Sequence, residues 1–294
     1  MVKICTVGQY WKEKFGEKVY RVSIDGGFTC PTRDGTKGRG GCYFCDEEGS
    51  RAQYIKSIDG IDKQIEAGIS KLKKMGMNRF ISYFQSYTST YAAVDVLRKK
   101  YYTALSHPDV VGISVSTRPD CINKENVSLL NEIAGEYYTI VELGIQSVHQ
   151  TSLDLIGRKH TVKESEEAVR MLKESGQIEI VAHVILGLPG ETENDITRTA
   201  KVISEWGVDG VKLHHLYIVK GTLFAKYFLN GSIKIYEKCE DYARIAQKFI
   251  MNLPENIVIH RFSGYANGNR LIAPKWTRDR HIARNLILGD SQKI

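Results

Sequence analysis

Apolar residues occur along the chain in six near-continuous runs, and helix-like segments lie between these runs. Residues 181–186, Val-Ala-His-Val-Ile-Leu, are a typical run. Strands that are covered on both faces have this character. The predicted strands are 19–24, 79–85, 110–117, 138–146, 178–186 and 210–218. The predicted helices between them are 58–75, 91–106, 124–134, 163–175 and 193–206.

The alternation of strand and helix predicts an α/β fold in which right-handed crossovers join a parallel sheet. A sixth helix is predicted at 236–251 and a further strand at 257–262. Six such units favour a partial (β/α)6 barrel of the TIM type with a short C-terminal extension. We expect residues 1–225 to form the barrel with its N-terminal loop. Residues 226–294 should add a helix, a strand and a basic tail that pack on the barrel.

The composition fits one large domain with an appendage. Of the 294 residues, 42% are hydrophobic, so the chain can bury a large core. No apolar run approaches the length of a membrane span, and no charged-then-apolar leader opens the chain. Six cysteines in this length do not make a disulfide scaffold. We expect a cytoplasmic protein whose thiols stay reduced and available to a metal.

Positive charge is concentrated near the C-terminus. The net charge is +7, and residues 261–294 alone carry +5, because seven Lys or Arg residues stand against two Asp residues. Phe262, Tyr265 and Trp276 are interleaved with them. Such a tail could lie along a phosphate backbone, or it could be a solvated extension. The basic residues are Arg261, Arg270, Lys275, Arg278, Arg280, Arg284 and Lys293.

Polar residues gather at the C-terminal ends of the predicted strands, where barrels of this kind carry their chemistry. Packing alone would not bring polar side chains from six successive strands to one rim. Any single buried His or Glu can still be a hydrogen-bonded core residue. The main candidates are Gln85, Arg118, Glu142, Gln146, His183, Lys212, His214, His215 and Tyr217.

Three cysteines, Cys30, Cys42 and Cys45, stand in the spacing C-x11-C-x2-C on a glycine-rich loop after the first strand. Three thiolates can hold three irons of a 4Fe–4S cluster and leave the fourth iron open to a small molecule. A zinc site would need a fourth ligand to close it, for which the chain offers its other cysteines. A thioredoxin-like redox pair would begin a helix directly after its strand. The spacing by itself leaves the three alternatives open.

Further motifs follow the cysteine loop in chain order. An aromatic residue, Phe44, stands directly before the last cysteine. Then come Thr-Arg-Pro-Asp at 117–120, Glu-Leu-Gly-Ile-Gln-Ser at 142–147, Arg-Lys-His-Thr at 158–161 and His-Val-Ile-Leu-Gly-Leu-Pro-Gly-Glu at 183–191. Together they make residues 19–222 resemble the radical S-adenosylmethionine (SAM) superfamily. The long first cysteine gap departs from the common C-x3-C-x2-C and resembles the branch that contains the catalytic subunit of Elongator.

Within that branch the chain is most similar to the small single-barrel YhcC/YtqA-like family. Too little chain follows the barrel for an acetyltransferase domain, and Ala-Pro-Lys-Trp at 273–276 resembles that family's tail. One departure concerns the second strand. It ends with Gln-Ser-Tyr-Thr at 85–88 instead of the usual Gly-Gly-Glu, so an acidic contact to the methionyl amine is missing there.

The resemblance implies a 4Fe–4S cluster and SAM as cofactors, with Cys30, Cys42 and Cys45 as cluster ligands. Gln85 would keep a main-chain contact to the methionyl amine, and Arg158 would pair with the methionyl carboxylate. Lys212 and His214 are expected to face the substrate inside the barrel, because alternate residues of a strand share a face. The residues expected to contact SAM are Phe44, Gln85, Glu142, Gln146, Arg158, Ile185 and Gly187.

The branch resemblance points to tRNA as the substrate and to the 5-substituent of the wobble uridine as the target. The implied reaction removes the carboxymethyl group of 5-carboxymethylaminomethyl-uridine and leaves the aminomethyl form. The basic tail would clamp the anticodon stem-loop, and a protein such as flavodoxin or ferredoxin would donate electrons. Two alternatives are a radical SAM oxidoreductase acting on a small anionic substrate such as a porphyrinogen, and a metal-stabilised RNA-binding module.

Overall fold

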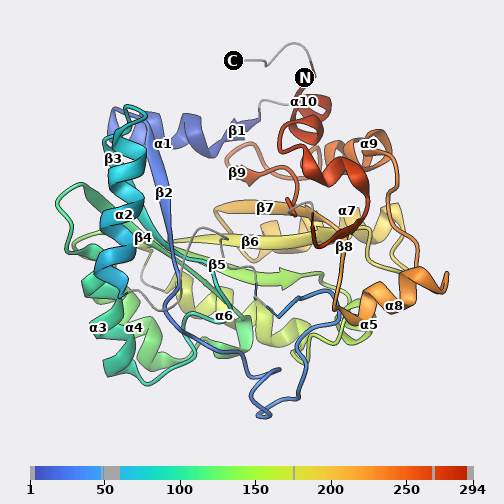
Figure 1. Ribbon diagram of the computed structural model, residues 1–294, viewed down its shortest axis with the longest axis horizontal. Coiled ribbons are helices and arrows are strands. Elements are labelled where there is room, and N and C mark those ends of the chain that lie inside the picture. Colours follow the sequence, from blue (N-terminus) through green and yellow to red (C-terminus); the bar gives the residue numbers. More distant parts are fainter. Residues whose placement is uncertain (1–3, 48, 50–59, 175, 267–268, 290–294) are drawn as a thin grey trace.

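One curled, wholly parallel sheet organises the protein (Figure 1). The computed structural model describes residues 4–47, 49, 60–174, 176–266 and 269–289. The eight strands lie in the order β1-β9-β7-β6-β5-β4-β3-β2. The strands of this sheet are β1 (Cys5–Thr6), β2 (Val19–Ile24), β3 (Arg79–Phe84), β4 (Val110–Thr117), β5 (Tyr138–Gln146), β6 (Ile178–Leu186), β7 (Gly210–His215) and β9 (Val258–Arg261).

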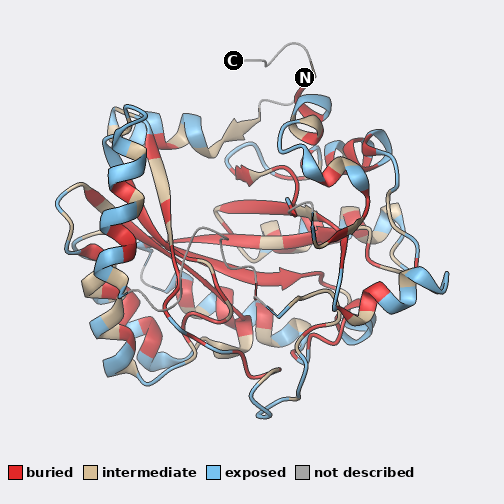
Figure 2. Cartoon of the chain, in the orientation of Figure 1, coloured by how far each residue is buried: buried red, intermediate tan, exposed pale blue. Residues whose placement is uncertain are grey.

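Helices cover the outer face of this sheet, and the main apolar core lies between the two layers (Figure 2). The sheet curls far enough for β2 to approach β9 through a side-chain contact. The Arg21 Nη2 atom lies 2.9 Å from His260 Nδ1. The predicted partial barrel is therefore confirmed. The helices are α1 (Val7–Phe15), α2 (Ile61–Lys73), α3 (Val94–Leu105), α4 (Lys124–Ala134), α5 (Gln150–Leu155), α6 (Val162–Lys173), α7 (Glu193–Glu205), α8 (Leu223–Leu229), α9 (Cys239–Ile250) and α10 (Ile282–Leu288).

Helix α1, which the sequence did not predict, closes the N-terminal end of the barrel. It lies between β2 and β9 (Figure 1) and contacts both strands. Trp11 is its one fully buried residue, and the indole Nε1 donates to the Tyr138 hydroxyl at 3.1 Å. The ring packs in an apolar layer with Val19, Ile81 and other residues from the N-terminal parts of the strands. Truncation of a buried Trp costs about 3–5 kcal/mol, so this layer contributes substantially to stability.

The C-terminal residues pack closely on the barrel. Strands β8 (Ile218–Val219) and β10 (Leu271–Ala273) form a small antiparallel sheet, and α10 packs on α9. The Trp276 ring lies 4.0 Å from that of His215. Phe262 is buried in the main core. The segment is therefore not a solvated extension, and among its three aromatic residues only Tyr265 is exposed.

Most element boundaries agree with prediction within three residues. The predicted strand 210–218 is wrong in extent, since β7 ends at His215 and the chain turns away to pair β8 with β10. Residues 58 and 59 of the first predicted helix, residue 175 of the fourth and Lys293 lie outside the described residues. The division at residue 225 stays a prediction, and α8 crosses it. No helix in the described part of the chain is long and apolar enough to cross a membrane.

Candidate active site

The cysteine loop leaves the C-terminal end of β2 and is anchored to distant parts of the barrel. The Tyr43 amide donates to the Ile156 carbonyl at 3.0 Å, and the Phe224 amide donates to the Tyr43 carbonyl at 3.0 Å. Within the loop, the Cys45 amide donates to the Cys42 carbonyl at 2.9 Å. Because α5 and α8 hold Tyr43 from two sides, Cys42 and Cys45 have fixed positions. All three loop cysteines are free thiols.

Cationic side chains surround the cysteine sulfurs. Arg158 Nη1 lies 3.5 Å from Cys42 Sγ, and Arg118 Nη1 lies 3.9 Å from the same atom. Arg33 Nη2 lies 3.4 Å from Cys45 Sγ. Guanidinium groups remain charged under all ordinary conditions. The Cys42 and Cys45 sulfurs therefore lie in an electropositive setting.

The pKa shifts of the loop thiols reflect burial and these neighbours. Burial would raise the pKa of Cys30, but the Thr32 and Thr88 hydroxyls and the charge of Arg118 lower it overall. Burial and the negative charge of Cys42 raise the pKa of Cys45 to about 11. A thiol with so high a pKa is deprotonated at neutral pH only when a metal takes the place of its proton.

Arg118 is braced by a buried carboxylate. Its Nε and Nη2 atoms donate to the two Asp120 oxygens, each at 2.9 Å, and Nη2 also donates to the Arg158 carbonyl at 2.7 Å. Lys37 donates to Asp120 at 2.7 Å. Arg118 is one of the polar candidates predicted at the strand ends, but its partners were not predicted. The short spacing between Arg118 and Asp120 in the sequence was the one indication that the two side chains pair.

These residues fit a 4Fe–4S cluster. Cys30 and Cys42 are buried, Cys45 is half-buried, and a thiolate cluster suits such a shielded loop. Among the described residues, no three His, Cys, Asp or Glu side chains are grouped closely enough to hold one metal ion. The thiols are thus not drawn together into the closed tetrahedral set of a zinc site.

The residues predicted to contact SAM come from the cysteine loop, from strands and from segments that follow strands or helices. Phe44 packs against the apolar cluster that contains Ile185. Gly187 has φ +86°, and a Cβ there would lie 2.5 Å from the Tyr236 ring, so only glycine fits. Gln146 also has positive φ, +71°, and Gln85 directly follows β3. Their contacts with SAM stay predictions.

Gly144 explains how Arg158 reaches the cysteine loop. Arg158 crosses β5 at this position, and its Nη2 atom donates to the Gly144 carbonyl at 2.7 Å. A Cβ at Gly144 would lie 2.4 Å from Arg158 Nη2 and 2.9 Å from Gln146 Nε2. The glycine in this motif therefore makes room for the guanidinium. The Nε atom of Arg158 is buried and has no hydrogen-bond partner among the described residues.

Glu142 lies deep in the barrel, and its carboxylate is hydrogen-bonded by other side chains of the protein. Burial would raise the pKa of this carboxyl, but Lys212, His183 and Arg21 hold it well below its usual range. This arrangement does not support the predicted contact between Glu142 and SAM. The carboxylate oxygens accept hydrogen bonds or ion pairs from Arg21, Tyr83, Ser114, Ser116, His183 and Lys212.

Lys212 and His214 share the inner face of β7, as the strand period predicted. The Lys212 ammonium lies 2.5 Å from a Glu142 oxygen, and the His214 ring lies 5.6 Å from that of His183. His215 faces outward and hydrogen-bonds Thr277 at 2.7 Å. The shared face is shown by these contacts, while the catalytic roles of Lys212 and His214 stay predictions.

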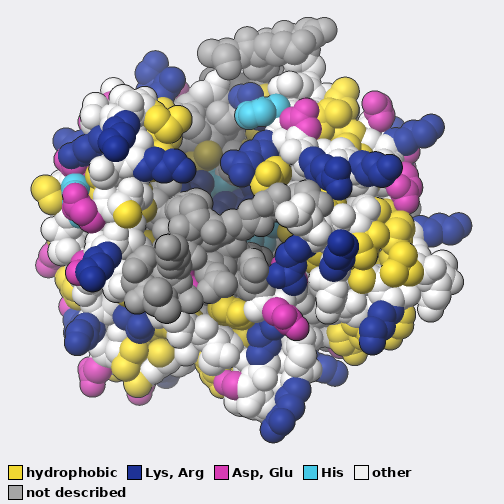
Figure 3. Space-filling model, in the orientation of Figure 1, with side chains coloured by type: hydrophobic (Ala, Val, Ile, Leu, Met, Phe, Trp, Pro, Cys, Tyr) yellow, Lys and Arg dark blue, Asp and Glu magenta, His cyan; other side chains and the backbone are white. Residues whose placement is uncertain are grey.

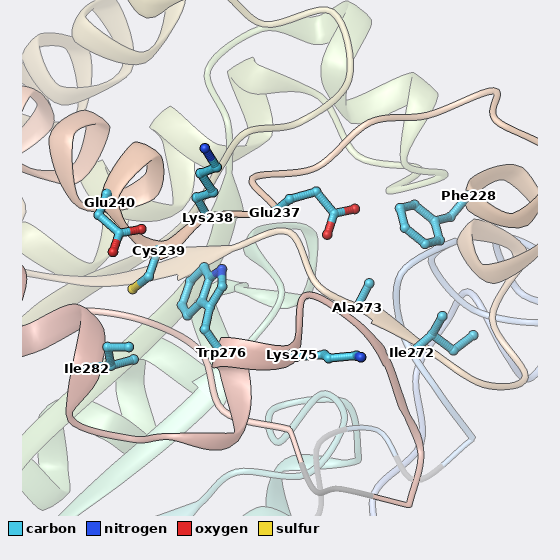
Figure 4. A pocket seen from close by; sticks show the side chains of 10 residues that line it. All are labelled: Phe228, Glu237, Lys238, Cys239, Glu240, Ile272, Ala273, Lys275, Trp276 and Ile282. Atoms are coloured by element: carbon cyan, nitrogen blue, oxygen red, sulfur yellow. The ribbon is translucent and has the colours of Figure 1, made fainter.

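A separate hollow of about 650 Å³ lies among the C-terminal elements (Figure 4). It contains none of the predicted site residues, and we assign it no part in the reaction. Its lining residues are Phe228, Glu237, Lys238, Cys239, Glu240, Ile272, Ala273, Lys275, Trp276 and Ile282.

Known proteins resemble the chain over most of its length. It is 38% identical to protein YhcC of Escherichia coli over 268 residues, which cover 91% of this chain and 85% of that one. It is 36% identical to the uncharacterized protein YtqA of Bacillus subtilis over 273 residues, which cover 92% and 84%. A tRNA uridine(34) acetyltransferase of Methanocaldococcus jannaschii is 26% identical over 179 residues, which cover 60% of this chain and 28% of that enzyme.

The fold is also similar to that of a solved archaeal structure. The archaeal Elp3 structure from Methanocaldococcus infernus matches 86% of this chain with a TM-score of 0.66 at 18% identity, and the chain spans 58% of that structure. Residues 35–203 match the model of the Radical SAM superfamily, and residues 208–288 match that of the Radical_SAM C-terminal domain. The chain therefore belongs to the radical SAM superfamily, in which a 4Fe–4S cluster and S-adenosylmethionine are the cofactors.

Proposed function

We propose that this protein modifies the wobble uridine of tRNA. In the proposed reaction, a hydrogen atom is abstracted from the carboxymethyl carbon beside the amine of 5-carboxymethylaminomethyl-uridine. Loss of one electron to the redox partner protein and of the amine proton then gives an imine. Water hydrolyses the imine, which releases glyoxylate and leaves 5-aminomethyl-uridine. The name of the archaeal relative, a tRNA uridine(34) acetyltransferase, supports the choice of nucleoside.

The observation that carries the proposal is the contact between the basic tail and the cysteine loop. Arg270 Nε lies 3.8 Å from the Asp46 carboxylate, and Asp46 directly follows Cys45. Lys275, Arg278 and Arg280 are exposed nearby in sequence. Lys and Arg side chains are prominent over the C-terminal elements (Figure 3). An RNA held by this surface would present its bases to the cysteine loop.

The bound cluster and SAM would supply a 5′-deoxyadenosyl radical that abstracts a hydrogen atom from the substrate. In this proposal Cys30, Cys42 and Cys45 hold the cluster, and Arg158 orients the methionyl carboxylate. Phe44 and Ile185 form an apolar wall for the adenine, where water is excluded. Lys212 and His214 line the space in which the 5-substituent lies. A flavodoxin or ferredoxin is the proposed electron donor.

The test uses anaerobically reconstituted protein, SAM, a reductant and tRNA that carries 5-carboxymethylaminomethyl-uridine. We expect 5-aminomethyl-uridine and 5′-deoxyadenosine to form together, as followed by nucleoside mass analysis. Cells that lack the gene should accumulate the carboxymethyl form in bulk tRNA. An unchanged nucleoside profile in both experiments would contradict the proposal. A matched reaction with tRNA that lacks the substituent controls for uncoupled SAM cleavage.

A further inference from the structure

The barrel interior holds more positive charge than its own carboxylates neutralise near β7 and β9. Arg21 and Lys212 both pair with Glu142, at 3.3 and 2.5 Å. Arg261, at the end of β9, makes no ion pair with any acidic side chain in the described part of the chain, and its buried Nε atom has no partner there. Burial and the positive charges of Arg21 and Arg261 lower the pKa of Lys212, although Glu142 raises it. Among the described residues, the guanidinium of Arg261 is therefore a cation without an acidic counter-ion.

Arg261 belongs to a group of three donors. Its Nη2 atom lies 3.2 Å from His214 Nδ1, and since a guanidinium can only donate, Nδ1 accepts. An imidazole whose Nδ1 accepts a hydrogen bond carries its proton on Nε2. Burial and the charge of Arg261 also hold the pKa of His214 well below its usual range. Neither His214 Nε2 nor the Tyr217 hydroxyl has a hydrogen-bond partner among the described residues. All three side chains are half-buried.

The segment after β9 holds these side chains together. A Cβ at Gly264 would lie 2.7 Å from the Tyr217 ring and 3.2 Å from His214 Nδ1, so the segment after β9 packs against both rings. Burial raises the pKa of Tyr217, Arg261 lowers it, and the charges of Asp46 and Cys45 raise it. The net shift is upward, so the Tyr217 phenol keeps its proton and can donate a hydrogen bond.

We propose that Arg261, His214 and Tyr217 form a receptor for one carboxylate of the substrate. A planar guanidinium matches the two oxygens of a carboxylate, while the neutral imidazole and the phenol add donors without adding charge. One monoanionic group would also balance the charge of Arg261, which pairs with no acidic side chain among the described residues. This inference rests on the proposed function, in which the carboxylate is that of the carboxymethyl group. A porphyrinogen would offer the same chemistry from another source.

The experiment compares three anticodon stem-loop RNAs that differ only at the wobble base, which is carboxymethylaminomethyl-uridine, aminomethyl-uridine or uridine. Dissociation constants are measured for the full protein with its cluster and SAM but no reductant. We expect the carboxylate form to bind about ten- to a hundredfold more tightly than the aminomethyl form, as a hydrogen-bonded charge would give. Arg261→Gln should reduce this ratio to about twofold or less. Tyr217→Phe, which removes only the hydroxyl, should reduce it by about threefold.

Lys275→Gln is the matched control, because an exposed tail cation should weaken all three RNAs equally and preserve the ratio. Iron content and melting temperature show whether each variant is folded. A wild-type protein without the preference, or an Arg261→Gln variant that keeps it, would overturn the inference.

A second arm separates this inference from the proposed function. If the intact protein binds no stem-loop but binds coproporphyrinogen, and Arg261→Gln weakens that binding tenfold or more, the tRNA proposal fails and the carboxylate receptor stands. If the protein binds neither probe, the receptor is refuted.

Discussion

At the scale of single residues, the cysteine loop combines covalent ligands with a fixed set of cations. The sequence predicted Cys30, Cys42 and Cys45 because three thiols on a glycine-rich loop are visible in one short stretch. It could not predict the surroundings of Glu142, whose partners come from β2, β3, β4, β6 and β7. Such a network depends on how the sheet curls, and no local pattern encodes it.

Replacing each loop cysteine tests the ligand assignment. Cys30→Ala, Cys42→Ala and Cys45→Ala should each lose cluster iron and 5′-deoxyadenosine formation, because each removes one of three thiolate bonds. Cys5→Ala, outside the loop, should retain both. Iron analysis and absorption spectra of reconstituted protein provide the measurement. Full iron content in Cys30→Ala would remove that residue from the ligand set.

Gly144→Ala tests the path of Arg158 across β5. The added methyl group would lie 2.4 Å from Arg158 Nη2, so the guanidinium must move. We expect SAM affinity to fall by about ten- to a hundredfold, which matches the loss of one hydrogen bond to a charged group. Gly8→Ala is the matched control, since nothing lies within 4 Å of a Cβ there. Equal SAM binding by both variants, measured by equilibrium titration, would place the methionyl carboxylate elsewhere.

At the scale of elements, the long strands were predictable and the short ones were not. Strands such as β5 and β6 are covered on both faces, so their apolar runs are unbroken and their ends stand out. Helix α1 escaped prediction because it buries only Trp11 and is otherwise largely polar. Strands β8 and β10 have two and three residues. Their existence follows from pairing between remote segments, which periodicity does not reveal.

The packing of the C-terminal elements on β7 makes stability depend on pH. Burial and the charge of Arg261 lower the pKa of His215 to about 3, whereas the unfolded chain has a value near 6.5. Below pH 6.5 the unfolded state therefore binds the extra proton. The free energy of unfolding should fall by about 1.4 kcal/mol per pH unit from this group.

Removing His215 should remove this dependence. In denaturant titrations of the full protein, the stability deficit of His215→Phe relative to wild type should shrink steadily between pH 6.5 and pH 4. At pH 8, where His215 is neutral in both states, the deficit should be constant and should reflect the lost Thr277 hydrogen bond. A deficit that does not change with pH would mean that His215 in the folded protein takes up its proton as readily as it does in the unfolded chain.

At the scale of the whole molecule, the tail is part of the fold as well as the proposed RNA surface. Ala283, Ile287 and Leu288 belong to the main core, so deleting the tail after Phe262 would unfold the protein rather than test RNA binding. The sequence showed the charge of this segment but not its packing. The reason is that Trp276 and Thr277 meet partners on α9 and β7, far away along the chain.

Point substitutions test the proposed RNA surface without disturbing the core. Lys275→Gln and Arg280→Gln should each reduce the slope of log affinity for tRNA against log salt by about 0.7–0.9, because one phosphate contact is lost. Lys63→Gln, an exposed position on α2, should leave the slope unchanged. Filter binding over a range of salt concentrations gives the slopes. Identical slopes for all three variants would exclude the tail from the interface.

Closure of one barrel end by α1 has a kinetic consequence. Because Trp11 and its apolar layer fill the N-terminal end, SAM and the proposed tRNA substrate would share the carboxyl end. A tRNA seated on the cysteine loop would cover that opening. The proposed reaction is therefore sequential and ordered: SAM enters before tRNA, and methionine and 5′-deoxyadenosine leave only after the tRNA departs. Turnover at saturating tRNA should then be limited by release of the modified RNA.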